Sequence, residues 1–258
     1  MMKLTVSTRL SLGAVWLLVG ALPAPAGVLY DGANAALPLP ENQGWAYGTN
    51  PFIGASVVQS AVAGGVRLDS TAVMAEQAGY FSEDPLSHTF THPGMTPLDR
   101  AAGYTVIFDM QINAESHASA DRAGFSLIAI SSDRMGIELG FWTDTIFAQA
   151  ADFTHAEEAA FDTTAKTRYE LEVVGNGYAL RAGGVATPIL TGSLRDYTPA
   201  VIPPPTPDVY EFPSFLFLGD DTTSAAASVD LAYVELVPEP AALSILAVGA
   251  LVLLRRRR

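Results

Sequence analysis

Cysteine is absent from this chain of 258 residues. Its absence excludes disulfide scaffolds, thiolate zinc sites, iron–sulfur clusters and cysteine nucleophiles. Charged residues are also scarce, at 16% against 49% hydrophobic residues. Disordered chains have the opposite composition, polar and highly charged. The sequence therefore describes a folded protein, long enough to bury one large core without covalent cross-links.

Basic residues are rare in the central part of the chain. Residues 27–237 contain 8 basic and 26 acidic residues, a net charge of −18. A surface this acidic repels nucleic-acid phosphates and anionic lipid headgroups. Nucleic acid is therefore excluded as an expected partner, while the acidity itself names no ligand.

Residues 1–26 have the pattern of a secretory signal peptide: two basic residues, a short apolar run and then small residues. Ala24 and Ala26 stand at the positions where a signal peptidase reads small side chains, so we expect cleavage before Gly27. The alternative is a buried N-terminal helix, which the prolines that end the apolar run disfavour.

The C-terminal segment has three parts. Pro238, Glu239 and Pro240 precede the apolar residues 241–254, and the chain ends in Arg255, Arg256, Arg257 and Arg258. A helix over 241–254 would be about 21 Å long, shorter than the roughly 30 Å hydrocarbon core of a bilayer. The arginines should remain on the cytoplasmic side, which places residues 27–237 on the opposite side.

This three-part tail over residues 238–258 resembles the PEP-CTERM sorting signal of Gram-negative exopolysaccharide producers. The resemblance implies recognition by an exosortase-type membrane protease, processing near the Pro-Glu-Pro motif, and export to the cell envelope, outer surface or extracellular matrix. Insertion of the tail into the inner membrane would then be transient. The alternative is an ordinary, permanent tail anchor.

Residues 27–237 alternate between apolar and polar side chains in many short runs, which predicts β-strands. Turn residues separate the runs, and Gly175-Asn176-Gly177 predicts a hairpin. Helix candidates are short, at residues 71–78 and 156–161. We therefore expect a single all-β antiparallel sandwich. Its expected buried residues are Phe108, Leu127, Leu139, Leu171 and Leu231.

The segments 121–142 and 215–222 resemble concanavalin-A-like, laminin-G-like jelly-roll domains. The whole layout is similar to that of the choice-of-anchor surface proteins, which have exchangeable C-terminal anchors. These resemblances imply a jelly roll outside the cell and assign no chemistry to it.

Glu138, Trp142 and Asp144 form the first candidate binding site, for a glycan. Glu138 and Trp142 are four residues apart, so they share one face of a strand, and Gly140 between them leaves a gap for a ligand. Tryptophan stacks on sugar rings and carboxylates accept bonds from their hydroxyls. The alternative is structural: Trp142 packs under a loop and Glu138 bonds a neighbouring backbone.

Asp220 and Asp221 follow a predicted strand and are candidate Ca²⁺ ligands, since Ca²⁺ prefers carboxylate oxygens. Adjacent aspartates on a turn also bond their own backbone. Asp121 and Arg122 fit an Asx turn and a surface ion pair. No cofactor other than this calcium is indicated.

The sequence favours an exported, non-enzymatic protein with a binding or structural role, associated with exopolysaccharide. Its expected partners during export are signal peptidase and the exosortase-type protease. One alternative is a divergent carbohydrate-active hydrolase or lyase, although Glu170 and Glu172 fit a solvated strand face better than a catalytic pair. A second alternative is a calcium-dependent adhesin.

Overall fold

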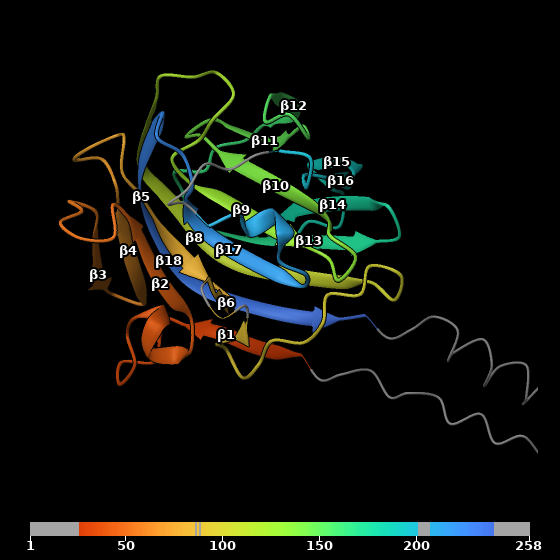
Figure 1. Cartoon of the computed structure of the whole chain (residues 1–258), viewed down its shortest axis with the longest axis horizontal. Helices are drawn as coiled ribbons and strands as arrows, with labels where there is room; N and C mark the ends of the chain where they lie inside the picture. The colour runs from red at the N-terminus through yellow and green to blue at the C-terminus, as the bar shows by residue number, and fades with distance from the viewer. Residues whose placement is uncertain (1–25, 86, 88, 201–206, 240–258) are drawn as a thin grey trace, which may run out of the picture.

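The computed structural model describes residues 26–85, 87, 89–200 and 207–239, which form two antiparallel sheets that face each other (Figure 1). The expected all-β class with a two-sheet antiparallel sandwich is confirmed. Ala24, Pro240 and the four terminal arginines lie outside the described residues. The signal peptide and the apolar tail therefore stay predictions.

We call the two layers sheet A and sheet B. Sheet A has the strand order β15 (Leu190–Ser193), β14 (Gly177–Ala182), β13 (Thr167–Val174), β8 (Tyr104–His117), β18 (Ala225–Pro238), β4 (Gly65–Asp69) and β3 (Val58–Val62), with β1 (Gly27–Asp31) also paired to β18. Sheet B has the order β12 (His155–Ala160), β11 (Thr145–Gln149), β10 (Met135–Phe141), β9 (Ser126–Ile130), β17 (Phe215–Asp220), β5 (Gln77–Phe81) and β2 (Ala46–Asn50), with β16 (Arg195–Asp196) also paired to β10.

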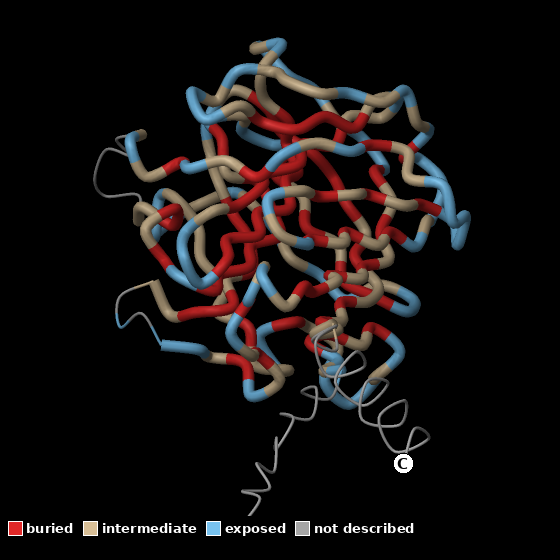
Figure 2. The backbone as a smooth tube through the Cα atoms, turned by 90° about the vertical axis from the view of Figure 1, so that its right-hand side faces the viewer, coloured by how far each residue is buried: buried red, intermediate tan, exposed pale blue. Residues whose placement is uncertain are grey.

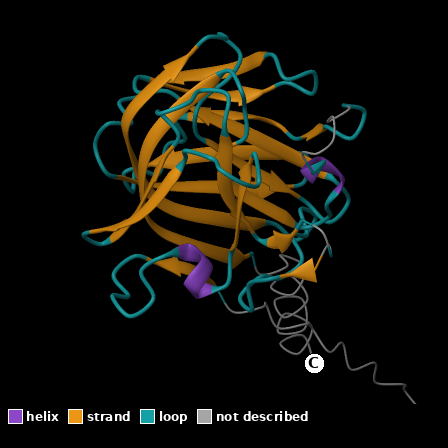
Figure 3. Cartoon of the chain, turned by 60° about the vertical axis from the view of Figure 1, so that its left-hand side comes forward, coloured by secondary structure: helices purple, strands orange, loops and turns teal. Residues whose placement is uncertain are grey.

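The remaining elements are short. The strands β6 (Glu83–Asp84) and β7 (Thr89–Phe90) form a small ribbon, and the helices of the described residues are the 3-10 turns η1 (Pro40–Gln43) and η2 (Val209–Glu211) (Figure 3). Both helix candidates are wrong. Residues 71–78 form turns that lead into β5, and residues 156–160 belong to β12. Pairing with neighbouring strands overrides the weak local helix preference there.

The core lies between the sheets, where buried backbone fills the middle of the molecule (Figure 2). All five side chains expected there are confirmed as buried: Phe108, Leu127, Leu139, Leu171 and Leu231. The predicted hairpin is also confirmed, because Val174 pairs with Gly177 across a two-residue turn in which Gly175 has a φ of 60°. That backbone conformation favours glycine.

The two ends of the described chain lie side by side, because Gly27 of β1 pairs with Leu236 of β18 (Figure 1). Strand β18 continues through Pro238, opposite Tyr104 of β8. The Glu239 N–H then donates to the Gly103 carbonyl at 2.9 Å, and the Thr105 hydroxyl donates to the Glu239 carboxylate at 3.2 Å. The first two residues of the Pro-Glu-Pro motif are thus bound to the sandwich. Among the residues described, no helix is long and apolar enough to span a bilayer.

Candidate functional site

The outer face of sheet B, which points away from the core, carries a second apolar cluster. Its fully buried members on the strands are Ile128, Ile130 and Phe215. Tyr197 and Tyr210, from the described residues that follow β16, pack on this face. Most of this sheet face is therefore covered by the protein itself, and the part that remains open is a pocket.

Strand register arranges the outer face in three rows that run across the sheet, since directly opposed residues of paired strands share a face. The aromatic row is Phe81, Phe217, Ile128 and Glu138. The glycine row is Gly48, Gly79, Gly219, Ser126 and Gly140. The polar row consists of the paired residues Asn50 and Gln77, whose side chains are joined by a hydrogen bond of 2.7 Å.

The aromatic row leans over the glycine row. A Cβ atom at Gly79 would lie 2.3 Å from the Phe217 ring, and one at Gly48 would lie 3.0 Å from the Phe81 ring. The two rings contact each other edge to face at 4.9 Å. Glycine is therefore required at Gly79 for this ring position, and the rings form one wall of the pocket.

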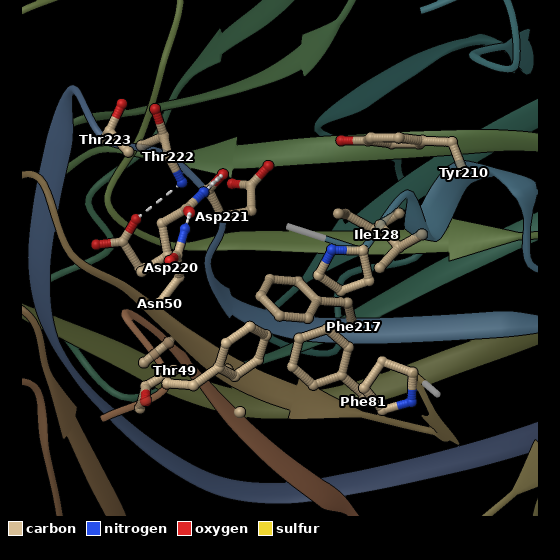
Figure 4. A pocket seen from close by; sticks show the side chains of 18 of the residues that line it. Thr49, Asn50, Phe81, Ile128, Tyr210, Phe217, Asp220, Asp221, Thr222 and Thr223 are labelled. Carbon is tan, nitrogen blue, oxygen red and sulfur yellow. Dashed lines mark hydrogen bonds between the residues drawn. The ribbon is translucent and has the colours of Figure 1, made fainter. Parts of the chain in front are cut away.

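The pocket is a cavity of about 400 Å³ (Figure 4). Phe81, Phe217, Ile128 and Tyr210 lie toward one end, and Asn50, Asp221, Thr222 and Thr223 lie toward the other (Figure 4). Ligand sites typically have volumes of about 300–1,000 Å³, apolar walls and a few convergent polar groups. This cavity has all three properties.

Glu138 is fully buried beside the aromatic wall. The Tyr210 hydroxyl donates to Glu138 Oε2 at 2.5 Å, and Arg122 Nη1 lies 3.7 Å from Oε1. Burial, followed by the charge of Asp221, raises the pKa of Glu138 to about 8, and the attraction of Arg122 only partly offsets this. Glu138 is therefore mostly protonated at neutral pH.

Two carboxylate oxygens in this cluster lack a donor among the described residues: Glu138 Oε1 and Asp221 Oδ1. Both acids face Arg122: its Nη1 lies 3.7 Å from Glu138 Oε1 and its Nη2 lies 2.7 Å from Asp221 Oδ2. The two carboxyl groups therefore lie around one guanidinium, and the charge of Asp221 adds to burial in keeping the proton on Glu138.

Arg122 completes the cluster. Its Nη2 donates to Asp221 Oδ2 at 2.7 Å, and its guanidinium lies 5.3 Å from the centre of the Phe153 ring. Burial alone would lower the Arg122 pKa, but the charges of Asp221 and Glu138 outweigh it and raise the pKa. The expected surface ion pair of Asp121 and Arg122 is wrong, because Arg122 is mostly buried and pairs with Asp221, while Asp121 accepts a bond from the His155 N–H.

The candidate site of Glu138, Trp142 and Asp144 is not assembled. Glu138 and Trp142 do share the outer face, but Glu138 lies beneath Tyr210. Trp142 stacks on His117 with ring centroids 4.1 Å apart and donates its indole N–H to the Arg122 carbonyl at 3.0 Å. Asp144 is exposed and bonds the adjacent Thr145.

The gap expected at Gly140 is filled by a side chain. A Cβ atom at Gly140 would lie 2.6 Å from the Phe147 ring, which occupies that space. Trp142 also packs against Phe147, with ring centroids 4.9 Å apart. The packing therefore agrees with the structural alternative, in which Trp142 packs against its neighbours.

Asp220 and Asp221 point to different partners. Asp220 is buried, accepts a bond from the Ser70 hydroxyl at 2.5 Å and so links sheet B to the end of β4. Asp221 faces Arg122. Across the described part of the chain, no three His, Asp or Glu side chains are grouped to hold a metal ion. Calcium binding here stays a prediction.

Sequence reasoning missed Phe81, Phe217, Tyr210 and Arg122, because residues far apart in the chain meet only when the strands pair. One signal was present: glycines alternate with bulky apolar residues at Gly79–Phe81 and Phe217–Gly219. Such glycines in strands mark places where something approaches the backbone closely. Here the groups that approach the backbone are aromatic rings, such as the Phe217 ring over Gly79.

No family model matches the chain, and no curated protein matches it by sequence. Among solved structures, it resembles a carbohydrate esterase from the Shiga toxin-encoding bacteriophage phi24B, with 11% identity, a TM-score of 0.52, and coverage of 83% of this chain and 100% of that one. At this identity the match shows a shared fold and nothing about the site.

Two further structures resemble the chain less well. A Bacillus subtilis protein of unknown function with a galectin-like fold has 9% identity and a TM-score of 0.46, over 82% of this chain and 96% of that one. A Trypanosoma rangeli sialidase has 13% identity and a TM-score of 0.41, over 70% of this chain and 27% of that one. At these TM-scores neither match carries an argument about this chain.

Proposed function

We propose that this is an exported, non-enzymatic carbohydrate-binding protein on a jelly-roll, concanavalin-A-like sandwich, and that its ligand occupies the pocket on the outer face of sheet B. One observation carries the proposal: a cavity of about 400 Å³ with aromatic rings on one side and amide, hydroxyl and carboxylate groups on the other. Sugars need both aromatic and polar groups, because their C–H faces pack on rings while their hydroxyls require hydrogen-bond partners.

Binding is favoured over hydrolysis by the surroundings of the acids. Glycosidases need two carboxyl groups that flank the scissile bond. Glu138 is fully buried beneath Tyr210, and Asp221 is paired with Arg122, so the two acids do not flank an open space. We therefore expect no release of reducing sugar from a polysaccharide panel, and reproducible release would favour the hydrolase alternative.

Export is part of the same proposal. Gly27 pairs with Leu236, so the predicted signal peptide and the predicted sorting tail are attached at the same end of the sandwich (Figure 1). The pocket lies on the opposite face of sheet B from the core and does not involve either end. Signal peptidase and an exosortase-type protease remain the expected partners during export, with exopolysaccharide as the expected ligand outside the cell.

Affinity electrophoresis of residues 27–239 in gels that contain neutral polysaccharides tests the proposal. We expect at least one polysaccharide to retard the wild-type protein. Gln77→Met should weaken the retardation, because it keeps the side-chain length but removes the amide that bonds both Asn50 and the Asp221 carbonyl and so holds the polar end of the pocket in place. Glu172→Gln, which alters the outer face of sheet A, is the control. Equal mobility of wild type and Gln77→Met on every polysaccharide would contradict the pocket as the site.

A further inference from the structure

The pocket has two chemically different ends, and their separation constrains the ligand. The aromatic row and the polar row are four residues apart along β5, from Phe81 to Gln77. At about 3.3 Å per residue this is about 13 Å, longer than a single sugar ring. Rings and Ile128 form one end, while Thr223 and Asp221 belong to the other (Figure 4).

The charges in the pocket balance. Arg122 is paired with Asp221, and the raised pKa of Glu138 leaves Glu138 mostly uncharged at neutral pH. Burial also raises the pKa of Asp220 well above its usual value. A charged ligand would therefore enter without a counter-charge, and burying an unpaired charge is costly. The strongly acidic surface of residues 27–237 further disfavours anionic ligands.

We propose that the pocket takes an uncharged sugar that carries an apolar acyl, alkyl or aryl substituent. The sugar hydroxyls lie at the polar row, and the substituent packs against Phe81, Phe217 and Ile128. Between these ends the Phe217 ring lies over Gly79 and the Phe81 ring lies over Gly48, so the two rings form the wall that the substituent contacts. This inference rests on the proposed function and adds to it the class of sugar that is recognised.

A series of alkyl glycosides tests the inference, measured by calorimetry below the concentration at which each forms micelles. The probes are glucose, methyl glucoside and glucosides with progressively longer linear alkyl chains, and the same set built on galactose. Affinity should rise about fourfold for each methylene that enters the aromatic end, until that end is full. An alkyl glucuronide and an alkyl amine of matching length should bind more weakly than the neutral glycoside.

Three variants locate the effect. Phe81→Ser should abolish the dependence on chain length, because it removes one of the two rings that the substituent contacts. Thr223→Val, an isosteric change at an exposed position, should weaken every glycoside by a similar factor. Val174→Ser, at a half-exposed apolar residue of the β13–β14 hairpin in sheet A, is the control for non-specific binding of alkyl chains. Phe81→Leu keeps an apolar wall and checks that loss of function in Phe81→Ser is not loss of fold.

The outcomes separate the two proposals. A rise with chain length that disappears in Phe81→Ser and persists in Val174→Ser supports the inference. Equal affinity for substituted and unsubstituted sugars would overturn the inference and leave carbohydrate binding intact. The same rise in all variants would show non-specific adsorption and overturn it as well. Preference for the glucuronide or the amine would overturn the neutral-ligand assignment, and absence of binding by every sugar would overturn the proposed function.

Discussion

The surroundings of Glu138, rather than the intrinsic acidity of its carboxyl group, keep this side chain uncharged. It is fully buried, its Oε2 accepts from Tyr210, and its charged form would lie beside Asp221. Burial raises the pKa of Glu138 from 4.5 to about 8. In the unfolded chain the same group ionises near its ordinary value, so folding and protonation are linked.

The free energy of unfolding should therefore fall as pH rises from about 4.5 to about 8. In this window the folded state keeps the Glu138 proton and the unfolded state loses it, so the folded state binds more protons and is destabilised by rising pH. Glu138→Gln mimics the protonated acid. Relative to wild type it should be nearly neutral near pH 4.5 and more stable by on the order of a few kcal/mol at pH 9.

Urea denaturation of both proteins across this pH range measures the difference. Taking the difference between variant and wild type removes the contribution of other titrating groups, such as Asp220. Glu211→Gln serves as the control, because Glu211 is an exposed partner of Arg134. A difference between Glu138→Gln and wild type that does not vary with pH would show that Glu138 is ionised in the folded protein.

Trp142 has a structural role in this packing. Its ring is stacked on His117 and packed against Phe147, and its indole N–H bonds the Arg122 carbonyl. Trp142→Ala should lower the free energy of unfolding by on the order of 2 kcal/mol, less than a fully buried tryptophan because the ring is partly exposed. Trp142→Phe should lose about 1 kcal/mol, mainly the hydrogen bond. An unchanged melting temperature in Trp142→Ala would restore Trp142 as a free stacking surface.

At the residue level the sequence predicted which face a side chain is on better than whether that face is open. Glu138 does lie opposite Leu139, as strand alternation requires. Its burial depends on Tyr210, which is 72 positions further along the chain. Alternation is a local property, whereas cover by a distant loop is not, so the pattern could not separate an exposed polar face from a covered one.

At the scale of the strand, the glycine row determines the shape of the pocket. Gly79 of β5 lies under the Phe217 ring of the neighbouring strand β17, and its Cβ position is also 2.9 Å from the Leu218 carbonyl. Backbone cannot move away as a side chain can. The row therefore fixes both the ring position and the depth of the pocket.

Gly79→Ala should destabilise the protein by about 1–3 kcal/mol through overpacking, and it should displace Phe217 and weaken ligand binding. Gly177→Ala is the matched control, because the nearest atoms to its Cβ position are 3.7 Å away, an ordinary contact. Thermal unfolding and binding assays on the two variants check the expectation. If Gly79→Ala were as stable and as active as Gly177→Ala, the glycine row would not define the site.

At the scale of the whole molecule, the sequence predicted the sandwich because its strands alternate strictly where one face is buried, as in Tyr104, Val106 and Phe108 of β8. It did not predict the second apolar cluster on sheet B. Strand β9 is apolar on both faces, which indicated burial on both sides. What covers its outer face, however, depends on the path of the chain after β16, which no local pattern determines.

The Pro-Glu-Pro motif begins inside the folded body. Pro238 is the last residue of β18, and Glu239 bonds both the Gly103 carbonyl and the Thr105 hydroxyl. A membrane protease that recognises the motif would meet Pro238 and Glu239 in a fixed, extended backbone. Pro238 and Glu239, the two motif residues that the structure describes, are held against β8 and Gly103.

Replacing Pro238, Glu239 and Pro240 with alanine should leave the protein unprocessed in the inner membrane, because the motif that the resemblance assigns to the protease is lost. Thr105→Val is the control: it removes the hydroxyl that donates to Glu239 and keeps the motif intact, so it should be exported normally. Fractionation and mass spectrometry of the exported protein measure both, and the mature chain should begin at Gly27. Normal export of the triple variant would show that the tail is not the sorting signal. Failure of both variants would mean that the contact between Glu239 and the sandwich, rather than the motif alone, is needed for processing.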